Sequence, residues 1–133
     1  MDQGERLFRF WFNAGKAKER LLTIDREALL HNEKPTAISF FPSGNGKKPN
    51  QFAVVSDKSV QITAIKQAHT SDDYIIRVYE PTGEPKITEL ALPMLGFKRK
   101  INLGGFEVKT LKISRHGRNW KNVDLIEKKL KST

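Results

Sequence analysis

The chain has 133 residues, which is enough for one domain with a buried core, and 38% of them are hydrophobic. No apolar run approaches the roughly 18 residues that a transmembrane helix needs, and the polar start, residues 1–6, is unlike a signal peptide. The absence of cysteine excludes disulfides and thiolate metal sites, and together these features predict a cytoplasmic protein that does not contact a membrane.

The net charge of +9 is concentrated toward the C-terminus. From Leu95 onward there are eleven basic and three acidic residues, a difference of +8. A module for nucleic acid or another polyanion, using Lys98-Arg99-Lys100 and the tail, is therefore one hypothesis. Nucleic-acid modules add stacking aromatics to such clusters, whereas Phe97 and Phe106 are at positions expected for a strand core, so nucleic acid is not the favoured partner.

The sequence pattern of the N-terminal third predicts a strand, a helix and a second strand. Leu7 to Phe12 alternates aromatic and other residues, so its aromatic face is expected to be a core face. Lys16 to His31 has apolar residues at helical spacing, and Asn32 and Pro35 end this helix. Ala37 to Phe41 is the second predicted strand. The members of the two apolar faces are Phe8, Phe10 and Phe12 in the strand and Ala17, Leu21, Ile24 and Ala28 in the helix.

Residues 42–50 are rich in glycine, proline and asparagine, which predicts an exposed loop and a boundary between two subregions. We expect residues 1–45 to be a strand-helix-strand segment and residues 46–133 to be a β-sandwich. The loop lacks the spacing of a phosphate-binding loop, and a strand follows it where such a loop requires a helix.

The remaining chain predicts short strands separated by turn residues, a pattern typical of an antiparallel sandwich. The fold class is therefore mainly β, an antiparallel β-sandwich with one short helix near the N-terminus. Residues 115–133 are expected to form a closing strand or a helix. The expected strands are Gln51 to Val55, Val60 to Lys66, Tyr74 to Glu80, Lys86 to Leu92, Phe97 to Leu103 and Glu107 to Ser114.

The strands Val60 to Lys66 and Tyr74 to Glu80 are expected to be adjacent and antiparallel. In the second strand Tyr74, Ile76 and Val78 alternate with Ile75, Arg77 and Tyr79, so both faces are partly apolar. This pattern predicts a sheet that is covered on one side and shielded in part on the other.

The sequence contains no recognisable catalytic, cofactor-binding or metal site. His31, His69 and His116 belong to different loops or helix ends, without a second ligand at metal spacing. Asp72-Asp73 has the character of a turn, and Ser114 has no nearby base or nucleophile-elbow context. Among the carboxylates no pair is distinguished for glycoside hydrolysis.

Several motifs, in order from about residue 2 to residue 127, resemble the C-terminal part of family 38 glycoside hydrolases, the α-mannosidases. Residues 2–10 are similar to its Gly-Glu-His followed by alternating aromatics, with Arg6 in place of the histidine, and Asn32 to Pro35 resembles its Asn-x-Pro. Residues 77–83 resemble its Arg-x-Tyr-Glu before a glycine turn, and residues 106–113 its Phe-Glu-Ile-Lys-Thr strand.

This resemblance implies a non-catalytic β-sandwich that packs on and shapes the catalytic domain of an enzyme that hydrolyses α-mannosides. Zinc and an aspartate nucleophile would belong to that catalytic domain, none of which is in this chain. The resemblance also implies that residues 1–45 end a larger β-domain. It predicts an exposed apolar patch toward the missing partner, and the candidates are Phe8, Phe10, Trp11 and Phe12.

Sugar contact is the main rival hypothesis. Arg77, Tyr79 and Glu80 are candidates because an arginine and an aromatic ring on one strand can hold a pyranose, although ion pairing of Arg77 and packing of Tyr79 on the sheet are favoured. A free-standing carbohydrate-binding module would instead expose Trp11, Tyr79 or Trp120. Self-association through the apolar surface that the missing domain would cover is an alternative that the sequence leaves open.

Overall fold

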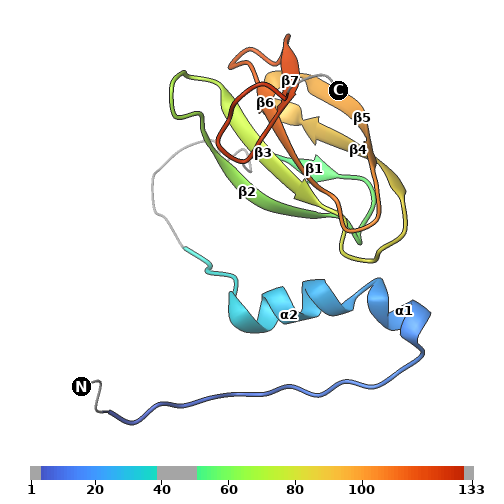
Figure 1. Cartoon of the computed structure of the whole chain (residues 1–133). Coiled ribbons are helices and arrows are strands. Elements are labelled where there is room, and N and C mark those ends of the chain that lie inside the picture. Colours follow the sequence, from blue (N-terminus) through green and yellow to red (C-terminus); the bar gives the residue numbers. More distant parts are fainter. Residues whose placement is uncertain (1–3, 39–50, 131–133) are drawn as a thin grey trace, which may run out of the picture.

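The structure is a computed structural model that describes residues 4–38 and 51–130. An antiparallel β-sandwich follows an N-terminal unit made of an extended segment and two helices (Figure 1). One sheet has three strands in the order β1-β4-β5, and the other has four in the order β2-β3-β6-β7. The strands are β1 (Val54–Val55), β2 (Gln61–Gln67), β3 (Tyr74–Tyr79), β4 (Lys86–Leu92), β5 (Phe97–Leu103), β6 (Val108–Ile113) and β7 (Trp120–Val123).

The core lies between the two sheets and follows the alternation of apolar residues along the strands. Ile76 and Leu111, from the four-stranded sheet, face Leu90 and Leu92 from the three-stranded sheet, and all four are fully buried. A short 3-10 helix, η1 (Pro93–Leu95), joins β4 to β5. The predicted fold class is confirmed, and β4 and β5 have the bounds expected from the sequence.

The expected pairing of β2 with β3 is confirmed, but a bulge between Ile62 and Ala64 shifts the register. Because a bulge places two residues opposite one, the alternation expected for β2 does not persist along the strand. Ile62 pairs with the inward-facing Val78, whereas Ala64 pairs with the outward-facing Arg77. β2 is also an edge strand, so one of its sides has no neighbour within the described sheet.

The outer face of the four-stranded sheet is partly covered by residues 124–130, which cross β3 in Figure 1. Ile75 is fully buried on this face and forms a small cluster with Ala68 and Val123. The predicted sheet with one covered face and one partly shielded face is therefore confirmed. The predicted closing strand is β7, which pairs with β6.

The N-terminal unit differs from the sequence prediction in two ways. Residues 7–12 are extended but pair with no strand among the described residues, so the aromatic face that was expected to be a core face is exposed instead. The single predicted helix is two helices, α1 (Ala17–Leu21) and α2 (Ile24–Asn32), interrupted where Thr23 takes a non-helical conformation. The second predicted strand begins at Ala37, but its residues from 39 onward, and the loop 42–50, lie outside the described residues.

Candidate functional site

The two motifs that begin at Arg77 and Phe106 meet at one end of the sandwich. There the turn after β3 (residues 80–85) and the turn between β5 and β6 (residues 104–107) lie side by side, and we call this pair of turns the Glu80 junction. A Cβ added to Gly105 would lie 2.1 Å from the Gly83 carbonyl oxygen, so the two backbones approach as closely as only glycine allows.

The side chain of Glu80 holds this junction together from inside. It is fully buried, and its Oε1 accepts hydrogen bonds from the Thr82 backbone N–H, at 2.9 Å, and from the Thr82 hydroxyl. Its Oε2 accepts from the backbone N–H groups of Gly83, at 2.8 Å, and Phe106, at 3.2 Å. One carboxylate therefore ties both turns together.

The ionisation of Glu80 reflects a balance of two effects. Burial opposes the charged form, but the hydrogen bonds from Thr82, Phe106 and Gly83 together outweigh burial, so the pKa of Glu80 lies below its ordinary value. With all four bonds directed inward and no exposed surface, Glu80 does not contact a sugar. The structure thus places this sugar-contact candidate in a structural role.

Arg77 and Tyr79 lie on the outer face of the four-stranded sheet, and the structure gives Arg77 a different partner from the expected carboxylate. Its guanidinium donates to Thr110 Oγ1 at 3.3 Å and to the Leu125 carbonyl oxygen at 3.4 Å. It therefore holds the crossing segment 124–130 on the sheet. Tyr79 is half-buried at the same face.

Glu127 fixes the other side of that crossing segment. Its carboxylate accepts hydrogen bonds from the Lys66 ammonium and, at 2.7 Å, from the backbone N–H of His69. The hydrogen bond from Lys66, followed by that from His69, holds the pKa of Glu127 below its usual range. Asp124 Oδ1 caps the turn by accepting from two backbone N–H groups, those of residues 126 and 128.

Phe106 is a correction to the sequence prediction of a core position. Its side chain is 64% exposed, and its φ of 58° lies in the left-handed region, which bulky residues rarely adopt. The Glu80 carboxylate and the close approach at Gly105 fix that backbone. Phe97, the other aromatic predicted for the core, is buried as expected. Strand alternation alone does not distinguish these positions, because Phe106 belongs to the turn before β6.

The aromatic candidates for sugar binding are separated rather than gathered. Trp11 lies on the N-terminal segment, Tyr79 on the outer sheet face and Trp120 on the edge strand β7. Trp11 is half exposed and stacks on His31 with ring centroids 4.7 Å apart, while Trp120 packs edge-on against Phe97. They form no shared platform.

A hollow of about 390 Å³ lies between the extended segment and α2. An ion pair lines it: Arg20 Nη1 donates to Glu27 Oε1 at 3.0 Å, and Asn13 donates to the same carboxylate. The hydrogen bonds from Arg20 lower the pKa of Glu27 to about 2. This arrangement joins the extended segment to the helices and contains one carboxylate, too few for acid–base hydrolysis by a pair.

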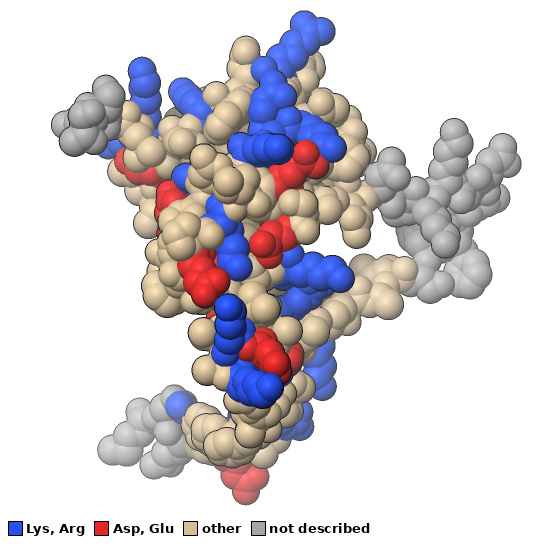
Figure 2. Space-filling view, turned by 90° about the vertical axis from the view of Figure 1, so that its right-hand side faces the viewer, with Lys and Arg blue, Asp and Glu red and all other residues tan. Residues whose placement is uncertain are grey.

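On the face that Figure 2 shows, basic side chains are interspersed with acidic ones. Lys98 lies 2.9 Å from Glu89, and Arg99 lies over the Phe97 ring. Further ion pairs join Lys112 to Asp73 at 3.5 Å, Lys109 to Glu107 at 3.1 Å and Arg115 to Asp72 at 3.7 Å. This interleaving weakens the case for a dedicated polyanion surface, which would be dominated by one sign of charge.

No metal cluster and no membrane span were found in the part of the chain that the structure describes. There, no three His, Asp or Glu side chains lie together as metal ligands. No described helix is long and apolar enough to cross a bilayer.

These features define the class as an antiparallel β-sandwich module whose turns and outer face are tied together by carboxylates with structural roles. Residues 59–133 match the family model described as the glycosyl hydrolases family 38 C-terminal beta sandwich domain, so the chain belongs to that family. The match begins just before β2 and covers more than half of the chain. Neither a search of curated proteins nor a search of solved structures found a match.

Proposed function

We propose that this chain is the non-catalytic C-terminal portion of an α-mannosidase-like hydrolase, and that it packs on and shapes the domain that hydrolyses α-mannosides. Family membership supports a place beside a glycosidase domain. In this proposal, zinc and the catalytic residues belong to that other domain.

The main support for this proposal is the exposed aromatic segment, residues 7–12. Phe8, Phe10 and Phe12 are 70%, 76% and 96% exposed, and Trp11 between them is half exposed, as the resemblance predicted. Contiguous apolar surface of this kind marks a site of contact with another protein surface. An extended segment with alternating aromatics also has the form of a strand that adds to a neighbouring sheet. We therefore assign residues 4–38 to the contact with the preceding domain.

The test is complementation. The chain is assayed on an aryl α-mannoside with zinc, alone and after mixing with a separately expressed family 38 catalytic region. We expect no hydrolysis by the chain alone and increased hydrolysis on mixing. A variant with Phe8, Phe10 and Phe12 replaced by serine should fail to increase it, while Ile87→Ser, which changes an equally exposed side chain on the sandwich, should behave as the parent chain. Zinc-dependent hydrolysis by the chain alone would refute the proposal.

A further inference from the structure

The turn between β5 and β6 carries an aromatic residue, Phe106, in a backbone conformation that bulky side chains rarely adopt. Phe106 has a φ of 58° and a side chain that is 64% exposed. A bulky residue in the left-handed region is strained, and such strain persists only where surrounding contacts over-determine it. Glycine or asparagine would fit this backbone more easily, so the identity of the side chain calls for an explanation outside the turn itself.

Several contacts hold the backbone of Phe106 in this conformation. The Phe106 N–H is bonded to the buried Glu80 carboxylate, and Gly104 N donates to Glu107 Oε2 at 2.7 Å while its carbonyl oxygen accepts from Glu107 N. The ring lies against Gly83, where an added Cβ would come within 2.6 Å of it. The ring is therefore presented in one orientation, at a small loss of side-chain freedom on binding.

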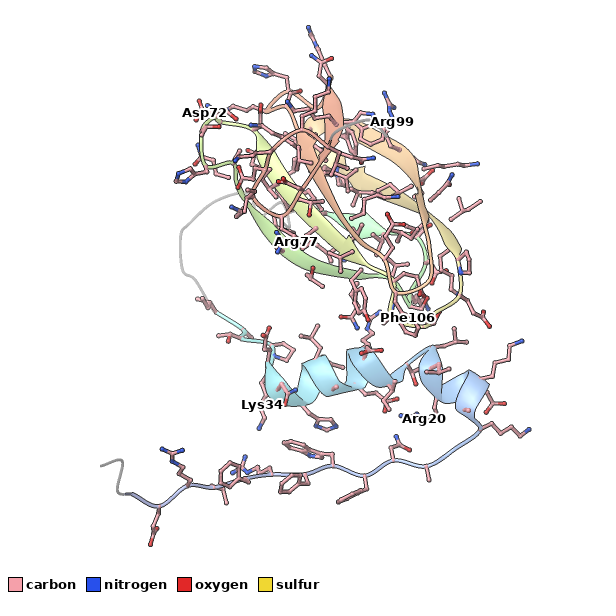
Figure 3. All side chains as sticks on the ribbon, in the orientation of Figure 1. Arg20, Lys34, Asp72, Arg77, Arg99 and Phe106 are labelled. Atoms are coloured by element: carbon pink, nitrogen blue, oxygen red, sulfur yellow. The ribbon has the colours of Figure 1, made fainter. Side chains whose placement is uncertain are left out.

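The groups around Phe106 favour contact of its ring with a protein surface over contact with a sugar. A sugar site places free polar groups beside the ring, but the carboxylates of Glu80 and Glu107 are already engaged with backbone amides. Phe106 lies at the end of the sandwich nearest the helices (Figure 3). At that end Leu21 and Leu22, which are 45% and 47% exposed, line a hollow of about 240 Å³. Its other lining residues are polar or charged: Lys18, Thr82, Glu84 and Lys86.

We propose that Phe106 is an anchor residue through which the sandwich itself docks on the preceding domain of the same enzyme. The occupant is argued from continuity, because the Phe106 end of the sandwich adjoins the N-terminal unit whose aromatic segment is assigned to that contact. The inference rests on the proposed function and extends it from residues 4–38 to the sandwich. Buried aromatic anchors of this kind often dominate the affinity of an interface.

The test compares binding and stability in the full chain. Phe106→Gly and Phe106→Ala both remove the ring, but only glycine relieves the left-handed backbone. We expect both variants to bind a separately expressed family 38 catalytic region at least about 10-fold more weakly than the parent chain. We also expect Phe106→Gly to melt about 4 °C or more above Phe106→Ala, which shows that the parent backbone is strained. Met94→Ala, a 68% exposed residue in η1 at the opposite end of β4, is the matched control and should bind as the parent chain.

The outcomes separate the two proposals. If the parent chain binds and both Phe106 variants bind equally well, the anchor proposal is overturned while the proposed function stands. If Phe106→Gly melts well below the parent chain, the ring serves the stability of the sandwich and the anchor proposal is again overturned. If the parent chain does not bind at all, both proposals fail together.

Discussion

Replacing Glu80 by glutamine removes the charge at the centre of the Glu80 junction without changing its shape. The amide keeps one acceptor oxygen, which can serve Gly83 and Phe106, while its NH₂ group faces Thr82. The Thr82 hydroxyl can turn to accept from that group, but the buried Thr82 N–H then loses its acceptor. An unsatisfied buried N–H costs about 1–3 kcal/mol, and the two remaining bonds lose their charge assistance, so we expect a loss of about 2–4 kcal/mol.

Urea unfolding at pH 7 measures this loss, which corresponds to a melting temperature lower by roughly 10–25 °C for a sandwich of this size. Glu84→Gln is the matched control, because Glu84 is exposed in the same turn and should change stability by less than about 0.5 kcal/mol. If Glu80→Gln is no more destabilising than Glu84→Gln, the structural role assigned to the buried carboxylate is wrong.

The same variant tests the pH dependence of stability. Because the folded pKa of Glu80 is depressed, the contribution of Glu80 to the free energy of unfolding is full above the unfolded pKa of about 4.3 and is lost as pH falls through the folded pKa. The difference between parent and Glu80→Gln should therefore shrink in acid.

Three further outcomes follow from the same structure. Gly83→Ala should cost about 1–2 kcal/mol in urea unfolding, because φ is +80° and the new Cβ would collide with the ring of Phe106; unchanged stability would contradict this. Glu127→Gln should speed proteolysis and amide exchange of residues 124–130 at pH 7 by weakening the bond from Lys66. The parent chain should show the same loosening as pH falls through the depressed pKa of Glu127, and equal exchange in both proteins would count against the anchoring role. Leu111→Ala should cost about 2–5 kcal/mol, since the side chain is fully buried between the sheets, and a loss below about 1 kcal/mol would show that this core is loosely packed.

The strands of the sandwich were predictable because the signals that define them are local. Proline and glycine mark the ends of β4 and β5, and alternation identifies Ile76 and Val78 as inward-facing residues of β3. The bulge at Ile62 was not predictable, since nothing in the apolar pattern of β2 signals an extra residue. The aromatic segment 7–12 reads as a core strand because alternation reports that a face is apolar and not which surface covers it.

Only part of the candidate site, the Glu80 junction and the contacts of Arg77, could be predicted from the sequence. A carboxylate before a proline-glycine turn, as at Glu80, is as typical of an exposed turn as of a buried one. Its role depends on Phe106, which is distant in the sequence and close only once β3 and β6 have paired. The partner of Arg77 was missed for the same reason, because Leu125 reaches it through the fold of residues 124–130.

The segment that crosses the outer face of the four-stranded sheet also sets an order of events during synthesis. Ile75 and its neighbours are synthesised some fifty residues before the segment that covers them. Lys66 is likewise synthesised before Glu127, its hydrogen-bond partner 61 positions later in the sequence. While the chain is still emerging from the ribosome, this face of β3 is therefore an exposed apolar surface beside an unpaired edge, the kind of surface on which nascent chains aggregate. We therefore expect this face to be covered only after residues 124–130 have emerged from the ribosome.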